Sequence, residues 1–342
     1  MVKEEKKEEV IKVTVVMLAY NHEQWISKAI DSIVQQKTDF KFKLFVHDDC
    51  STDNTKAIIE QYHKKYSDIV VPFYETENLY SKDIKITEKI LLPHIKSEYI
   101  AMCEGDDYWT DLSKLQQQVD YMESHKNCTL CFHNADFVDT DGNMLKPFYP
   151  QNIWNDFEIE KKISFQNGAD FSVIEILRLD FTPTASLMFR YELYNELRKF
   201  DISLDLLIRL IATNMGYAHY INKKMSAYRT GNSQSASGVL QNSEQKLFDE
   251  FYKLHCSILD EFDEYTNFQY HEEILKQEER KKLTVYASTL NLKKMKDSSE
   301  YKNLKKMYIV KILAKKYLSG PFNLIKILKT KMYQGTRGEN EV

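Results

Sequence analysis

Residues 13–53 read VTVVMLAYNHEQWISKAIDSIVQQKTDFKFKLFVHDDCSTD, and this stretch decides the fold class. Its first six residues form a continuous apolar run rich in β-branched side chains, which is typical of a buried parallel strand. Apolar residues then recur at helical spacing over residues 23–36 and predict an amphipathic helix. A second apolar run at residues 42–46 predicts the next strand. This alternation indicates an α/β fold with a parallel sheet.

The same patterns extend in both directions along the chain. A helix over 55–66 and a strand over 69–74 complete a strand, helix, strand, helix, strand series, which describes a doubly wound sheet. Further helices are predicted at 85–94, 112–124, 171–180, 191–199 and 205–215, and further strands at 99–103, 129–138, 185–189 and 218–228. Residues 141–170 contain Gly and Pro and are predicted to be a loop. From about residue 240, Lys and Glu dominate and predict a helical C-terminal extension.

Composition excludes several protein classes. The 342 residues are 43% hydrophobic and 29% charged, which is globular rather than disordered or fibrous. No apolar run approaches the roughly 18–20 residues of a membrane-spanning helix, so we do not expect an integral membrane protein. The first ten residues, MVKEEKKEEV, lack the apolar segment of a signal peptide, so we expect a cytoplasmic location. Five cysteines are an odd number and suit reduced thiols.

The net charge of −4 conceals an asymmetry. Residues 301–342 carry ten Lys or Arg against two Glu, so residues 1–300 carry −12. The acidic body is a poor match for nucleic acid, and we expect no such partner. Apolar residues and Lys alternate at helical spacing within 301–335, which suits a helix on the anionic inner face of the cell membrane. A packing face within the protein, or a dimer contact, explains the same pattern equally well.

Three polar clusters follow predicted strands, at residues 19–21, 47–49 and 104–107. The carboxyl ends of parallel strands meet at one edge of a sheet, where ligands bind, so we expect these clusters to converge. A carboxylate pair at such an edge suits Mg²⁺ or Mn²⁺, because these hard cations prefer oxygen ligands. A solvated turn is the alternative explanation for the Asp pair at residues 106 and 107.

In combination, these motifs strongly resemble family 2 glycosyltransferases of the GT-A fold. The resemblance covers about residues 12–235 and is carried by the Tyr-Asn pair after the first strand, the DDCSTD turn and the GDDYW block. It implies a GT-A domain with a doubly wound mixed sheet. It also implies transfer of a sugar from a nucleotide diphosphate, usually with inversion at the anomeric carbon. Two positions depart from the family pattern: Leu112 replaces a common Pro, and no His follows Tyr228-Arg229.

Carried over residue by residue, the resemblance implies a nucleotide site. Ala19, Tyr20 and Asn21 would line the pocket for the base and ribose, with the Tyr20 ring beside the base. Asp49 would accept a hydrogen bond from the imide N–H of uracil or thymine, which suits an ionised carboxylate. Asp106 would lie near the ribose and the metal ion. The expected donor is therefore a UDP-sugar, and a dTDP-sugar would satisfy the same Asp49 contact.

The resemblance also implies metal and catalytic residues. Asp107 would bind Mn²⁺ or Mg²⁺ directly, with Asp106 beside it, so that the metal neutralises the departing diphosphate. Asp205, eleven residues before Gly216, would be the base that deprotonates the acceptor hydroxyl. A helix cap is the alternative role for Asp205, and Asp201 is the rival candidate for the base.

Two further residues have candidate substrate contacts. Trp109, beside the metal motif, would contact the acceptor sugar. Arg229 would reach the diphosphate or form a salt bridge.

The predicted organisation is a frayed segment at 1–11, a GT-A domain at 12–238 and a helical extension at 239–342 that is basic from 301. Within the GT-A domain, 12–110 would be the nucleotide-binding half and 111–238 the acceptor half.

The function predicted from the sequence is inverting, metal-dependent glycosyl transfer to a glycan or a lipid-linked acceptor in surface polysaccharide synthesis. A catalytically degenerate binding protein of the same fold is one alternative. A sugar-nucleotide nucleotidyltransferase is another, but it would need a Gly-rich basic loop where this chain has AYNHEQW.

Overall fold

The computed structural model describes residues 10–82, 86–149, 156–179, 181–200, 205–231, 252–288 and 291–299, together with 301 and 309. Asp201 lies outside these residues, as does the predicted membrane-binding segment 301–335 apart from residues 301 and 309. The chain divides into two compact units. One comprises Met1–Ser243 with His255–Ile274, and the other comprises Glu244–Leu254 with Leu275–Val342. The predicted domain boundary at residue 238 stays a prediction.

The first unit is built on a mixed sheet that has ten strands in the described part of the chain. Its strand order is β3-β2-β1-β4-β9-β6-β10-β5, with β7 added beside β6 and β8 beside β10. The strands are β1 (Ile11–Ala19), β2 (Lys41–Asp48), β3 (Val70–Tyr74), β4 (Tyr99–Met102), β5 (Tyr108–Trp109), β6 (Cys128–Val138), β7 (Met144–Pro147), β8 (Ala169–Phe171), β9 (Met188–Arg190) and β10 (Tyr217–Arg229).

Strands β1 to β4 are all parallel, as the alternating apolar and helical segments predict. Strand β9 lies between β4 and β6 and is antiparallel to both. Strand β10 runs parallel to β6 on one side and antiparallel to the short β5 on the other. The predicted doubly wound mixed sheet is therefore present.

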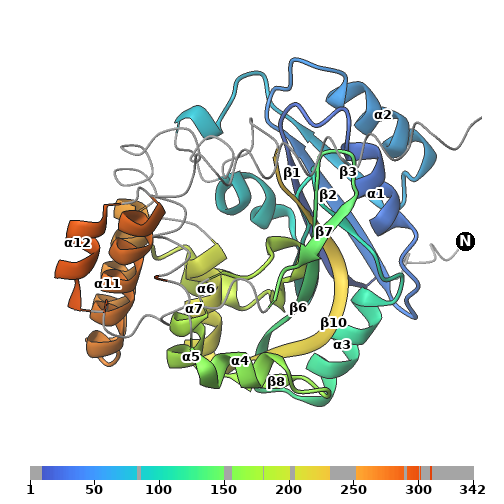
Figure 1. The fold of residues 1–342 in the computed structure, drawn as a ribbon. Coiled ribbons are helices and arrows are strands. Elements are labelled where there is room, and N and C mark those ends of the chain that lie inside the picture. Colours follow the sequence, from blue (N-terminus) through green and yellow to red (C-terminus); the bar gives the residue numbers. More distant parts are fainter. Residues whose placement is uncertain are drawn as a thin grey trace, which may run out of the picture. The chain divides into compact units, whose positions relative to one another are not determined.

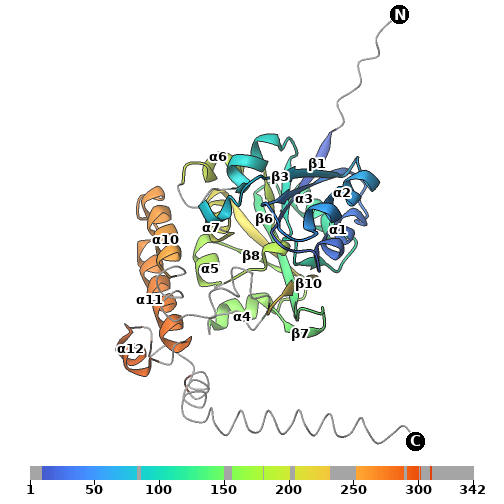
Figure 2. The same ribbon diagram turned by 90° about the horizontal axis from the view of Figure 1, so that it is seen from above.

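Helices cover both faces of this sheet (Figures 1 and 2). One face packs against α1 (Ile26–Val34), α2 (Thr55–Lys65) and α3 (Lys114–Ser124). The other face packs against α4 (Phe157–Ile163), α5 (Val173–Arg178), α6 (Leu193–Leu197) and α7 (Asp205–Met215). A hydrophobic core lies on each face of the sheet, and side chains of β1 alternate between the two. Val13, Val15 and Met17 belong to the core on the α1 side, and Val16 belongs to the core on the other side.

The structure corrects three of the predicted elements. Residues 141–170 are not one loop, because they contain β7, α4 and the start of β8. The predicted helix at 85–94 is a short π-helix at Thr87–Leu91 followed by a 3₁₀ turn at Leu92–His94, where Pro93 prevents regular continuation. The strand predicted at 185–189 begins only at Met188, because Thr184–Ser186 form a 3₁₀ turn.

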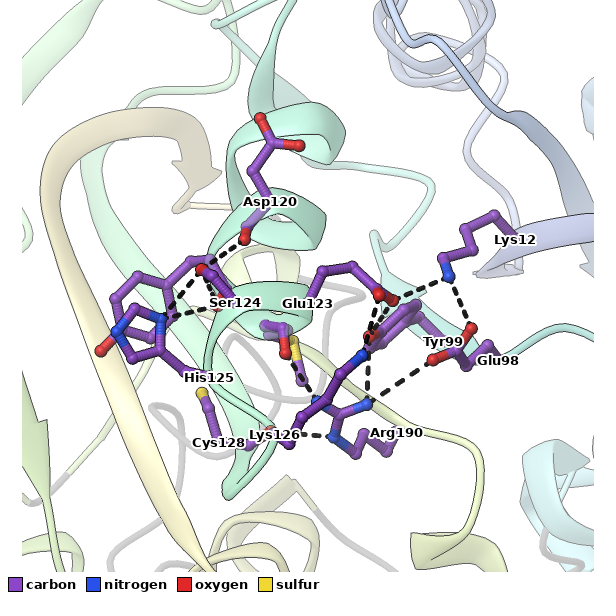
Figure 3. Close-up of polar contacts among 12 residues, drawn as sticks. Lys12, Glu98, Tyr99, Asp120, Glu123, Ser124, His125, Lys126, Cys128 and Arg190 are labelled. Carbon is purple, nitrogen blue, oxygen red and sulfur yellow. Dashed lines mark hydrogen bonds and ion pairs between the residues drawn. The ribbon is translucent and has the colours of Figure 1, made fainter.

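An ion-pair network joins the amino-terminal ends of β1 and β4 to α3 (Figure 3). Lys12 Nζ lies 2.6 Å from Glu98 and 2.7 Å from Glu123, and the Tyr99 hydroxyl donates to Glu123 at 2.6 Å. Arg190 donates to the Tyr99 hydroxyl and to the carbonyl oxygen of Met122. This network holds together the sheet edge opposite the carboxyl ends of the strands.

The C-terminal region contains α10 (Lys253–Tyr265), α11 (His271–Ser288) and α12 (Leu292–Asp297). Ile258, Leu259 and Phe262 of α10 belong to the core of the first unit. Within the described ranges, no helix combines the length and apolarity needed to cross a bilayer.

Candidate active site

The three polar clusters converge at the carboxyl ends of the parallel strands. Strand β1 ends at Ala19 directly opposite Asp48, the last residue of β2. The Asp49 amide donates to the Ala19 carbonyl at 3.0 Å, and the Gly105 amide donates to the Leu18 carbonyl at 3.0 Å. The prediction that these motifs share one edge of the sheet is confirmed.

Asn21 fixes the turn between the first two clusters. It has a positive φ of 55°, a conformation that Asn tolerates better than most residues. Its side-chain oxygen accepts the Thr52 amide at 2.8 Å, and its own amide donates to the Ser51 hydroxyl at 2.9 Å. The adjacent Tyr20 is 39% exposed, so its ring is accessible. Placement of the base beside Tyr20 stays a prediction.

The buried carboxylate of Asp49 holds the segment that follows β3. Its two oxygens accept the amides of Leu79 at 2.7 Å and Tyr80 at 3.0 Å. Sequence reasoning assigned this carboxylate only to a nucleobase. In the structure, Asp49 also has a second role, because it positions the backbone at residues 79 and 80. An ionised carboxylate has about four lone-pair sites, so two amide contacts leave acceptor capacity for a base.

Gly105 allows the third cluster to approach the first. A Cβ atom at this position would lie 2.7 Å from His22 Nδ1 and 2.9 Å from the Ile26 side chain, so a larger residue would have to displace these neighbours. His22 Nδ1 is buried and has no hydrogen-bond partner among the described residues. Burial lowers the pKa of His22, against the opposing effect of nearby Asp106. Sequence reasoning missed His22, although it directly follows the Tyr-Asn pair.

Asp106 and Asp107 are both buried. Asp107 Oδ1 accepts the backbone amide of Arg229 at 2.8 Å, whereas Oδ2 is buried with no hydrogen-bond partner among the described residues. Burial raises the pKa of Asp107 well above its usual value, and the charges of Asp106 and Glu104 raise it further.

This pair fits a divalent cation. Two adjacent carboxylates, one with an unpartnered oxygen, offer the oxygen ligands that Mg²⁺ and Mn²⁺ prefer. Among the described residues, no group of three or more His, Cys, Asp or Glu is arranged to hold a metal ion. Two protein ligands would leave the other coordination positions for phosphate oxygens and water.

Asp205 begins α7 and lies near the same cluster. Burial, the charge of Asp106 and then the charge of Asp205 raise the pKa of Glu104 to about 8. Asp205 Oδ2 is buried without a hydrogen-bond partner within the described part of the chain. The structure therefore brings Asp205 near Glu104, the first residue of the third cluster, although they are about 100 residues apart in sequence. Its predicted role as the base stays a prediction, and Glu104 is a neighbour that sequence reasoning gave no role.

Trp109 and Arg229 both have structural partners. The Trp109 side chain is buried, its Nε1 donates to the Ala185 carbonyl at 2.8 Å, and Lys114 Nζ lies 4.0 Å from its ring centroid. This buried, hydrogen-bonded position argues against the predicted contact with an acceptor sugar. The Arg229 guanidinium donates to the backbone carbonyls of Asp106, Asp139 and Thr140. These bonds take the place of the salt bridge, one of its two predicted roles, and contact with the diphosphate stays a prediction.

Comparison with known proteins identifies a family and a fold. The family model described as "Glycosyl transferase family 2" matches residues 14–190, which contain all three clusters. Staphylococcus aureus TarS (residues 1–349), solved in complex with UDP-GlcNAc, is similar in structure with a TM-score of 0.50 over 81% of each chain. At 16% sequence identity this likeness shows the fold, which is that of GT-A enzymes.

Curated relatives are similar over part of their length. An uncharacterized protein of Mycobacterium tuberculosis is 30% identical over 63% of this chain, and the match spans 58% of that protein. TuaG of Bacillus subtilis, a putative teichuronic acid biosynthesis glycosyltransferase, is 26% identical over 44% of this chain and 58% of its own. WfgD of Escherichia coli, a UDP-Glc:alpha-D-GlcNAc-diphosphoundecaprenol beta-1,3-glucosyltransferase, is 28% identical over 41% of this chain and 52% of its own.

Proposed function

Because the chain belongs to glycosyl transferase family 2, and is therefore a glycosyltransferase, we propose that it transfers a sugar from UDP to an acceptor hydroxyl with inversion and with help from a divalent metal ion. The acceptor is a glycan or a lipid-linked sugar in the synthesis of a surface polysaccharide. The names of TuaG and WfgD support this setting, and that of WfgD supports both the UDP-sugar donor and the lipid-linked acceptor.

One observation carries the proposal. Asp107 Oδ2 and Asp205 Oδ2 are both buried carboxylate oxygens without hydrogen-bond partners among the described residues, and Glu104 interacts electrostatically with both Asp107 and Asp205. A purely structural carboxylate in such a position would be costly, because buried charge needs a partner. A metal ion would be the partner of the Asp107 carboxylate, and the proton of the acceptor hydroxyl would be the partner of the Asp205 carboxylate.

The donor would bind across the nucleotide-binding half, residues 12–110. The Tyr20 ring lies beside the base, the backbone of Ala19 and Asn21 lines the ribose pocket, and Asp49 accepts the imide N–H of uracil. A dTDP-sugar offers the same imide, so it is the second candidate donor. Asp49 has already ordered the backbone at Leu79 and Tyr80, which reduces the conformational entropy lost on binding.

The acceptor would enter from the half at residues 111–238, where Asp205 begins α7. Asp205 accepts the proton of the acceptor hydroxyl as that oxygen attacks the anomeric carbon, opposite the departing diphosphate. Attack from that side inverts the configuration. A Mn²⁺ or Mg²⁺ ion held by Asp107 and Asp106, when bound, neutralises the charge that develops on the diphosphate.

Replacing Asp107 tests the proposal. We expect Asp107→Ala to abolish transfer and to remove the effect of Mn²⁺ on UDP binding, while metal-free UDP binding stays near the wild-type value. Asp136→Ala is a matched control, because this carboxylate pairs with Lys224 on the same sheet and has no assigned role in the site. Near-normal, metal-dependent turnover by Asp107→Ala would remove Asp107 from the metal site and reject the proposed mechanism.

A further inference from the structure

Arg229, the last residue of β10, connects three segments that are distant in sequence. Its amide donates to Asp107 Oδ1 at 2.8 Å, and its Nε donates to the carbonyl of Asp106 at 2.8 Å. Its Nη1 donates to the carbonyls of Asp139 and Thr140, each at 2.8 Å. One residue therefore holds both the Asp106–Asp107 pair and the turn between β6 and β7.

The guanidinium is buried among aromatic rings, which fixes its plane. Its central carbon lies 5.5 Å from the centroid of the Trp25 ring and 5.9 Å from that of Tyr108. Trp25 Nε1 donates to the Thr140 carbonyl at 3.0 Å, so it is a second anchor for the same turn. Arg229 itself is only 5% exposed.

The geometry assigns Arg229 as a positioning residue for the metal ligands rather than as a ligand of the donor diphosphate. The planar guanidinium fork fits three carbonyl oxygens at once, which a lysine ammonium on a flexible stem would not reproduce. Together, the amide and the fork hold Asp107 by its side chain and Asp106 by its backbone. Asp107 Oδ2 is thereby left as the oxygen that would bind the metal. This inference rests on the proposed function, in which Asp107 is the metal ligand.

Arg190 is a matched control for Arg229. It is also a largely buried arginine that donates to backbone carbonyls, those of Cys128 at 3.0 Å and Met122 at 2.7 Å. It belongs to the network at the amino-terminal ends of β1 and β4 (Figure 3). Arg190→Lys therefore loses comparable contacts at the opposite edge of the sheet.

The first test measures hydrogen exchange in the metal-free protein. We expect Arg229→Lys to accelerate exchange in peptides covering 104–110 and 139–143, whereas Arg190→Lys leaves both peptides unchanged. Equal exchange at 104–110 in the two variants would overturn the inference. Trp25→Phe is a milder second variant, which should loosen 139–143 alone because the Arg229 contact to Asp106 remains. Equal loosening of 104–110 in Trp25→Phe would assign the anchoring to Trp25 instead.

The second test measures Mn²⁺ affinity by electron paramagnetic resonance with UDP present. Arg229→Lys should weaken Mn²⁺ binding about tenfold or more, the usual cost of losing a residue that orients a metal ligand. Arg190→Lys should retain wild-type affinity. An equal loss of UDP affinity with Mn²⁺ and with EDTA would identify a diphosphate contact and overturn the positioning role. Wild-type protein that binds no Mn²⁺ with any nucleotide would reject the proposed function, while hydrogen exchange would still decide whether Arg229 positions the loop.

Discussion

The backbone amide of Arg229 and the Asp107 carboxylate are joined by a 2.8 Å hydrogen bond across 122 residues of sequence. The bond exists because β10 pairs with β5, placing Ser226 and Ala227 opposite Trp109 and Tyr108. The predicted metal motif is therefore held by the end of β10, a strand far from it in sequence. The Asp107 carboxylate has this partner only when β10 is paired with β5.

The first prediction concerns the proposed base. Asp205→Asn keeps the shape of the side chain but removes its ability to accept a proton. We expect UDP and Mn²⁺ affinities within about twofold of the wild type and turnover reduced by about 10²–10⁴-fold, the usual range for general base catalysis. Calorimetric nucleotide binding and a transfer assay measure the two quantities separately. Parallel loss of binding and turnover would point to a structural role at the start of α7.

The second prediction concerns the network in Figure 3. Hydrogen bonds from Lys12 and Tyr99 lower the pKa of Glu123 below its ordinary value of 4.5. A carboxylate with a lowered pKa stabilises the fold above its unfolded pKa, and this stability is lost as pH falls through the folded pKa. Glu123→Gln should therefore be less stable than the wild type at pH 7, with the difference shrinking below pH 4.5. Urea denaturation at several pH values measures this, and a difference that does not depend on pH would contradict it.

The third prediction concerns Lys114, which is fully buried on α3. Burial lowers its pKa from 10.5 to about 7, and its Nζ donates to Gln118 at 2.8 Å. Between pH 7 and 10 the unfolded chain binds a proton here that the folded protein does not, so wild-type stability rises with pH. Relative to Lys114→Met, the free energy of unfolding should rise by about 1.4 kcal/mol per pH unit in that window and stay level below it. Chemical denaturation from pH 6 to 9 measures this. If the free energies of unfolding of the wild type and Lys114→Met change in parallel with pH, the lysine remains charged when folded.

Much of the fold is predictable from local patterns. The buried strands β1 and β2 each contain a continuous apolar run, and α7 spans Asp205–Met215, the predicted range. Strand β7 has no such signal, because its residues MLKP are mostly exposed and its pairing with β6 is what makes it a strand. The two-residue β5 likewise depends on its pairing with β10.

The candidate site shows the same limit. Parallel strand ends could be placed together from sequence, because topology alone brings Ala19 and Asp48 to one edge. The hydrogen-bond partners of each side chain could not be predicted from the sequence. The amides at Leu79 and Tyr80 that bind Asp49, and the carbonyls that bind Arg229, are set by loop conformations without a sequence signature.

Thermal stability with nucleotides tests the central claim most directly. A ligand that binds only the folded state raises the unfolding temperature, so UDP, dTDP, GDP, CMP and ADP can be compared, each with Mn²⁺ or with EDTA. The account predicts a Mn²⁺-dependent increase with UDP, or with UDP and dTDP, and none with the other nucleotides. The absence of any shift, or an equal shift with and without Mn²⁺, would contradict a metal-assisted donor site at Asp107.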